Sequence, residues 1–184
     1  MADTRENEDA ALLLTGFVNT LDVESGADAL ATPGELAGWL ADRGLVPDGT
    51  RAGEADLRTA LTLREGLREA MSANHGPQES DLPGDLDDAL AALPLRVELT
   101  GPRPALLPLD PPGTAAAGLA RIAAAIMEAV SAGIWPRMKV CQQDTCRWAF
   151  VDTSKNRSRA WCSMSTCGNR TKTRAYRARR RTPA

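Results

Sequence analysis

Four cysteines lie close together near the C-terminal end of the sequence, and the chain of 184 residues has no others. Cys141 and Cys146 form one pair and Cys162 and Cys167 a second, each with four intervening residues, and fifteen residues separate the pairs. Two such pairs supply the four thiolates that a tetrahedral zinc ion requires, each pair from one local turn. The pattern therefore predicts one structural Zn²⁺ ion per chain, held by all four cysteines.

Two other chemistries of paired cysteines stay open at this point. Two disulfide bonds would need an oxidising compartment, but the acidic segment MADTRENEDA does not resemble a secretory signal. An iron–sulfur cluster also takes four thiolates, although this spacing differs from the usual ferredoxin runs. The most apolar run contains Arg121 and Glu128, so it predicts a packed helix and no membrane span. We therefore expect a cytoplasmic protein, in which paired cysteines usually bind a metal.

The segment after Cys167 is dense in positive charge. Starting at Arg170, arginines recur at intervals of four, three and four residues, which in a helix places them on one face. The phosphates of a nucleic-acid backbone neutralise such a stripe well, so we predict that it binds DNA. The predicted nucleic-acid-binding residues are Arg170, Lys172, Arg174, Arg177, Arg179, Arg180 and Arg181.

Other roles for the basic segment remain open. It could dock on the acidic surface of a partner protein, or of its own chain, and the protein would then be an interaction adaptor. RNA could take the place of DNA, or the segment could be a solvated tail. All nine basic residues of residues 1–136 are arginines too, so the abundance of arginine does not indicate that particular bases are read.

The charge divides the chain into two parts. Residues 137–184 carry 13 Lys and Arg against 2 Asp and Glu, a net charge of +11, whereas residues 1–136 carry 9 against 22, a net charge of −13. We therefore expect an acidic domain over residues 1–136, with a core of its own, and a basic zinc module over residues 137–184. The module is too short to bury a sufficient core, so the metal is expected to supply much of its folding energy.

The first part is predicted to be a mostly helical α+β domain with a small antiparallel hairpin. The segment LRVELT alternates apolar and polar residues, and GPRP turns it toward ALLPLD, an edge strand. Thr32, Pro33 and Gly44 supply the cap, first-turn and stop signals of one short helix. From the apolar spacing, helices are expected over residues 8–21, 32–44, 54–73, 86–93 and 114–132.

The second part is predicted to run in the order zinc knuckle, hairpin, second cysteine pair and basic helix. Between the two pairs, RWAFVDTSKNRSRAW suggests a strand that turns back at SKNRS. Its aromatic residues, Trp148, Phe150 and Trp161, are expected to pack around the metal site rather than to stack on bases.

No motif of a known catalytic site stands out. The sequence has no G-x-S-x-G, P-loop or G-x-G-x-x-G motif, and its four cysteines are taken by the metal, so we do not expect an enzyme. The single histidine, His75, is expected to cap a helix or to face solvent. Asn19 and Asp22 could line a pocket for a small-molecule ligand, or form a helix cap and turn. Residues 1–136 could thus sense a ligand or form a homodimer.

The same residues resemble a known family. Cys167 to Arg170 reads C-G-N-R, and its context FVDTSKNRSRAWCSMSTCGNRTKTRAYRARR resembles the CGNR zinc-finger family. The segments FVNTLD and ELAGWLADRGL resemble the ABATE domain that precedes this finger. The resemblance implies a treble-clef-like zinc finger behind an α+β domain, in bacterial proteins considered to be stress-responsive transcription regulators. The ligands it implies are Cys141, Cys146, Cys162 and Cys167.

Overall fold

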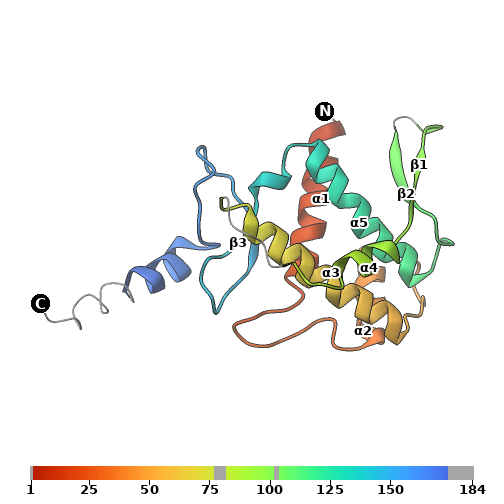
Figure 1. Cartoon of the computed structure of the whole chain (residues 1–184), viewed down its shortest axis with the longest axis horizontal. Helices are drawn as coiled ribbons and strands as arrows, with labels where there is room; N and C mark the ends of the chain where they lie inside the picture. Colours follow the sequence, from red (N-terminus) through yellow and green to blue (C-terminus); the bar gives the residue numbers. More distant parts are fainter. Residues whose placement is uncertain (1, 77–81, 102–103, 174–184) are drawn as a thin grey trace, which may run out of the picture.

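The computed structural model describes residues 2–76, 82–101 and 104–173 (Figure 1). Its helices and strands are α1 (Ala2–Val18), α2 (Pro33–Asp42), α3 (Glu54–Ala73), α4 (Leu86–Ala91), β1 (Leu95–Glu98), β2 (Ala105–Pro108), α5 (Ala115–Ser131), η1 (Trp135–Arg137), β3 (Met138–Val140), β4 (Ala149–Val151) and η2 (Met164–Gly168). The turn η1 is a 3₁₀ helix and η2 is a π-helix. Across the described part of the chain, no helix is both long and apolar enough to cross a lipid bilayer.

Local capping signals fix the ends of α2 and α5. The Thr32 hydroxyl accepts a hydrogen bond from the main-chain N–H of Glu35 at 3.2 Å, and Pro33 opens α2. After α2 the chain turns at Gly44, which adopts φ +64°, in the left-handed region that glycine tolerates. Thr114 begins α5 in the same way as Thr32 begins α2. These predicted boundaries are confirmed.

The helices pack around one hydrophobic core. α1 lies against α5, and α3 lies against α1 and α2 (Figure 1). Leu14 and Phe17 from α1, and Leu119 from α5, are fully buried where these elements meet. Each such side chain removed from water contributes about 1.5–3 kcal/mol to folding. The mostly helical character predicted for the first part is thus confirmed, with α1 ending at Val18, three residues before the predicted end.

The predicted hairpin of the first part is present. β1 and β2 pair antiparallel, with Leu95 opposite Pro108 and Arg96 opposite Leu107. The hairpin lies at one end of the long axis of the molecule, and the cysteine-bearing segment lies toward the other end (Figure 1).

A second hairpin, β3 with β4, corrects two predictions. β3 precedes Cys141, so the first cysteine pair lies in the connection between the two strands, not before the hairpin. Three residues are too few for alternation to reveal a strand, which is why the predicted order was wrong. In addition, Met138, Val140 and Ala149 are buried in the same core as the helices. The expectation that the first part has a separate core is therefore wrong.

Candidate metal centre

Four sulfur atoms converge in the second part of the chain. The Sγ atoms of Cys146 and Cys162 are 3.7 Å apart, and those of Cys162 and Cys167 are 3.8 Å apart. All four, including Cys141, lie within 4.8 Å of one another. A tetrahedron with Zn–S bonds of about 2.3 Å has edges of about 3.8 Å, so the cluster fits one structural zinc ion. A disulfide needs sulfurs about 2 Å apart, so the disulfide alternative is wrong.

The π-helical turn η2 positions one cysteine of the second pair. The main-chain N–H of Gly168 donates to the carbonyl of Ser163 at 3.0 Å, an i to i+5 bond. Cys167 lies within η2, whereas Cys162 lies in the segment just before its cap, Ser163. The turn therefore positions one ligand of the pair, and its Sγ atom comes within 3.8 Å of the Cys162 Sγ atom.

The first pair is held by a tight turn that ends in a strained residue. The N–H of Cys146 donates to the carbonyl of Gln143 at 2.8 Å, and Arg147 then adopts φ +49°. A left-handed residue other than glycine costs about 1–2 kcal/mol, so its neighbours must hold it in place. They do so from α3, where Arg68 donates to the Arg147 carbonyl at 2.9 Å and Glu69 pairs with the Arg147 guanidinium at 2.6 Å.

Ionisation of the thiols calls for a cation at their centre. Burial first, and then the neighbouring thiols, raise the pKa of Cys162 far above its usual value, and burial raises the pKa of Cys167 to about 11. Burial also acts against ionisation of Cys141, but N–H groups of Cys162 and Gln143 donate to its sulfur and hold its pKa below the usual value. A bound Zn²⁺ supplies the positive charge that keeps all four groups ionised.

The residues after Cys167 each have a structural role. A Cβ atom at Gly168 would lie 2.9 Å from the Met164 sulfur and 3.6 Å from the Trp161 ring, so a side chain there would displace the packing. Asn169 donates to the Ser165 carbonyl at 3.1 Å. Next along the chain, Arg170 reaches back to the first part of the chain and pairs with Glu24 at 2.6 Å.

Buried polar contacts join the metal centre to the helices. Arg68, which is 1 % exposed, also donates to the Val18 carbonyl at 2.7 Å. One guanidinium therefore bridges α1 and the cysteine knuckle, the turn from Cys141 to Arg147. The Asn19 side chain donates to the Ala149 carbonyl at 2.9 Å and accepts from its N–H at 2.7 Å. Sequence reasoning missed Arg68. The available signal was its position in the buried stripe of α3, four residues after Arg64 and three before Met71.

The end of α3 supplies two more of these contacts. Asn74 donates to the carbonyls of Trp135 and Met138, both at 2.8 Å. The Nε2 atom of His75 lies 2.6 Å from the Val140 carbonyl, next to the first cysteine. His75 is partly buried and its ring is bonded to β3, so the expectation that it caps a helix or faces solvent does not hold.

A buried ion pair organises the loop between the cysteine pairs. Lys139 Nζ lies 2.9 Å from Asp152 Oδ2, and the two side chains are 3 % and 0 % exposed. Burial by itself would raise the pKa of Asp152, but hydrogen bonds from Ser154, Lys139 and the Arg159 N–H outweigh it and lower that pKa. With its carboxylate fully bonded, Asp152 fixes the start of the loop.

The aromatic residues of the module differ in their environments. Phe150 is buried, with the Arg159 guanidinium carbon 5.0 Å from its ring centre, and Trp161 is partly buried beside Gly168. Trp148 is 40 % exposed, so its ring is not enclosed by the packing that we expected around the metal site.

The predicted nucleic-acid-binding residues are only partly within the described chain. Arg170 and Lys172 are exposed in the helical turns that follow the second cysteine pair. The others lie outside the described residues: Arg174, Arg177, Arg179, Arg180 and Arg181. Three expectations stay predictions. They are that the basic segment forms a helix, that the zinc module resembles a treble clef, and that a domain boundary lies at residue 136.

The side chains of Asn19 and Asp22 both have hydrogen-bond partners within the protein. Asn19 is occupied by Ala149, and the Asp22 carboxylate accepts from the N–H groups of Glu24 and Ser25, at 2.9 and 3.3 Å. The hydrogen bonds from Ser25 and Glu24 lower the pKa of Asp22 and match the predicted turn. The Asn19 side chain bonds to a distant strand instead of capping α1. The role of both residues in a ligand pocket stays a prediction.

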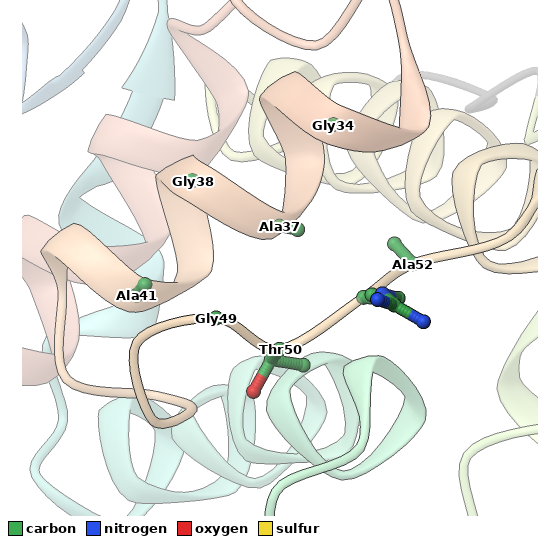
Figure 2. Close-up of a pocket in the computed structure, with 8 residues that line it drawn as sticks. Gly34, Ala37, Gly38, Ala41, Gly49, Thr50 and Ala52 are labelled. Atoms are coloured by element: carbon green, nitrogen blue, oxygen red, sulfur yellow. The ribbon is translucent and has the colours of Figure 1, made fainter.

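A hollow elsewhere in the first part is lined by small residues. Figure 2 shows Ala37 and Ala41 of α2 facing the segment from Gly49 to Ala52. Its volume is about 300 Å³. Among the residues that line this hollow, only Thr50 and Arg51 have side chains that could orient a ligand. The small size of the other lining residues is enough to explain why the hollow exists.

Comparison with known proteins covers most of the chain. Residues 12–133 match the family model described as "Putative stress-induced transcription regulator", the ABATE domain. Residues 137–180 match the CGNR zinc finger, which favours zinc over the iron–sulfur alternative. No curated protein matches the chain.

Proposed function

We propose that this chain, which belongs to the ABATE family, is a transcription regulator that binds DNA through the basic segment following its zinc centre. The observation that carries the proposal is the concentration of charge on a metal-organised module. Residues 137–184 have a net charge of +11, and four thiolates around Zn²⁺ leave this module near +9. A DNA backbone is the polyanion that such a module would attract.

The attachment of the basic segment supports the proposal. Arg170 and Lys172 follow directly on Cys167, so the metal fixes where the segment begins. Phosphate contacts of this kind position a protein on the duplex without reading its sequence. We therefore propose the seven basic residues from Arg170 to Arg181 as the phosphate-binding surface, and make no assignment of a target sequence.

The first part of the chain would control this activity. We propose that residues 1–136 sense a small-molecule ligand or form a homodimer, in the cytoplasm. The two families that match are a regulator family and a zinc finger, which supports a regulatory rather than a catalytic role.

The salt dependence of binding tests the proposal. Each neutralised phosphate contributes about −0.9 to the slope of log K against log salt, so about five contacts give a slope of roughly −4 to −5. Fluorescence anisotropy with a labelled duplex of random sequence measures this slope on the zinc-loaded full chain. A slope near zero would overturn DNA binding and favour docking on an acidic protein, and stronger binding to RNA would redirect the proposal.

A charge-matched control separates a binding surface from bulk charge. The double variant Arg174→Glu and Arg177→Glu should weaken binding to every duplex alike. The double variant Arg51→Glu and Arg58→Glu changes the net charge equally at exposed positions of the first part, and should leave most of the affinity intact. Equal losses in the two double variants would mean that no specific surface is involved.

A further inference from the structure

A cavity lies between the β1–β2 hairpin, α5 and the segment that follows α2. Its volume is about 510 Å³, within the range of about 300–1,000 Å³ typical of small-molecule sites. Leu45, Val46, Pro47 and Leu107 give it apolar walls. It is at the far end of the molecule from the metal centre, because the hairpin marks that end (Figure 1).

Three charged side chains also line the cavity: Arg96, Asp110 and Arg121. Arg96 lies on β1 opposite Leu107, and its guanidinium also pairs with Glu98 at 2.9 Å, so a ligand carboxylate there competes with Glu98. Arg121 is held in place by the carbonyls of Gly44 and Leu45, at 3.1 and 3.3 Å. The two guanidiniums give this lining a net positive charge.

Asp110 is the unusual member of this lining. Its Oδ2 atom is shielded from solvent and has no hydrogen-bond partner within the described part of the chain. A buried carboxylate oxygen without a donor costs about 1–3 kcal/mol or more, and a donor on a bound molecule would remove that cost. A turn of the Asp110 side chain toward the cavity would bring Oδ2 within reach of an N–H or O–H group on a bound molecule.

The walls of the cavity are built to keep their shape. Gly113 adopts φ +88°, and Pro47 and Pro112 restrict the neighbouring backbone. α5 approaches the wall closely at Gly118, where a Cβ atom would lie 2.7 Å from Val46. A preformed site of this kind loses little entropy when a ligand binds.

From these features we infer that the cavity binds a small amphipathic carboxylic acid that also carries a hydrogen-bond donor. The carboxylate faces the guanidiniums of Arg96 and Arg121, the apolar body lies against Leu45, Val46 and Leu107, and the donor reaches Asp110. The inference deepens the ligand-sensing part of the proposed function and rests on it for its regulatory meaning, but binding itself can be tested without DNA.

Three related probes dissect the site: indole-3-propionate, its neutral amide, and its N1-methyl derivative. The first has the carboxylate, the apolar ring and the N–H donor, and each of the others lacks one feature. Calorimetric titration of the zinc-loaded full chain should show that the parent acid binds at least about tenfold tighter than the amide, since a charge-assisted hydrogen bond is lost. The N1-methyl acid should bind several-fold more weakly than the parent.

Variants assign the contacts. Arg96→Gln should weaken binding of the acid about tenfold and leave the amide unchanged, and Asp110→Ala, which removes the acceptor, should abolish the preference for the N–H over the N-methyl probe. Arg121→Gln also removes bonds to two carbonyls, so Arg96→Gln is the variant whose fold is least at risk. Arg58→Gln, at an exposed position of α3, is the matched control and should change nothing.

Each outcome has a distinct meaning. Equal affinity for acid and amide, or no binding of any probe at millimolar concentration, overturns the inference. Probe binding that is normal in a chain without DNA affinity would overturn the proposed function and leave the site standing. DNA binding in a chain that takes up no probe would do the reverse.

Discussion

The side-chain amide of Asn19 pairs with both main-chain groups of Ala149, 130 residues further along the chain. It thereby takes the place of a neighbouring strand for β4. Together with the bridge from Arg68 to the Arg147 carbonyl, this pairing ties the end of α1 to the cysteine knuckle. The two parts of the chain, although opposite in charge, are thus held together by buried, directional contacts.

Replacing Asn19 tests this joint. Asn19→Leu leaves the N–H and carbonyl of Ala149 without partners, and we expect the free energy of unfolding to fall by about 2–3 kcal/mol. Urea unfolding of the zinc-loaded protein measures it. Asn156→Leu, at an exposed loop position of the module, should change it by less than about 0.5 kcal/mol. A similar value for both variants would show that the pairing contributes little.

What could be predicted from the sequence was local. The cap at Thr32 and the turn at Gly44 depend on residues within one helical turn, so the sequence alone reveals them. The four cysteines lie within 27 residues and need only short turns to converge, so their cluster could also be predicted. The hairpin β1–β2 has prolines and alternation to mark it.

What could not be predicted depends on partners far along the chain. The position of Arg68 in the buried stripe of α3 was visible, but its partner, the Arg147 carbonyl 79 residues away, was not. β3 has only three residues, and its burial comes from α3, not from its own pattern. The change of net charge at residue 137 also suggested two independent cores. That inference failed because the pattern of charged residues describes the surface of a protein and not its interior.

Loss of the metal should spread beyond the module. Cys162→Ser removes one ligand, so the protein should lose its zinc. Since Met138, Val140 and Ala149 belong to the shared core, we expect the helical part to melt several degrees lower as well. Elemental analysis and thermal unfolding followed by helical circular dichroism measure both effects.

The matched control for this variant is Thr153→Ser, a small change at an exposed position of the same module, which should keep the zinc and the melting temperature. If Cys162→Ser lost its zinc while the helices melted at the wild-type temperature, the two parts would be energetically independent despite their contact.

An ion pair in the helical part should make stability depend on pH. Asp28 and Arg64 form two hydrogen bonds, of 2.7 and 3.0 Å, and Arg64 is buried. Burial would raise the pKa of Asp28, but the bonds and charge of Arg64 outweigh it and lower that pKa. The resulting stabilisation is complete above the unfolded pKa of about 3.9 and is lost as the pH falls from there toward the lower folded value.

Asp28→Asn should therefore destabilise the protein at neutral pH by about 2–3 kcal/mol, because it removes one of the two carboxylates that pair with the buried Arg64 and leaves only Glu65. The difference from the wild type should shrink below about pH 4. Urea unfolding over a pH series measures it, with Asp48→Asn, at an exposed turn, as the control. A difference that stays constant from neutral pH to about pH 3 would mean that the charge of Asp28 is not what matters.

The opposite charges of the two parts meet at Glu24 and Arg170. Their carboxylate and guanidinium are 2.6 Å apart, and the two side chains are 47 % and 43 % exposed. Arg170 is also the first residue of the proposed phosphate-binding surface. Because the parts share a core, the segment from Gly133 to Pro136 does not hold the charges apart, and the acidic part is placed to compete with DNA.

Removing that competing carboxylate should strengthen DNA binding. Glu24→Gln frees Arg170 from an exposed ion pair worth about 0.2–1 kcal/mol, so we expect affinity at low salt to rise by roughly two- to fivefold. The gain should vanish at high salt, where the pair is already screened. Asp48→Asn removes the same charge at a turn in the first part of the chain, and its affinity should rise less at the same salt.

The full chain is the proper material for this titration, since residues 138–149 contribute to the shared core and a fragment from residue 137 onward would expose them. An equal rise in both variants would reduce the effect to net charge, and no rise in Glu24→Gln would show that the acidic part does not mask Arg170.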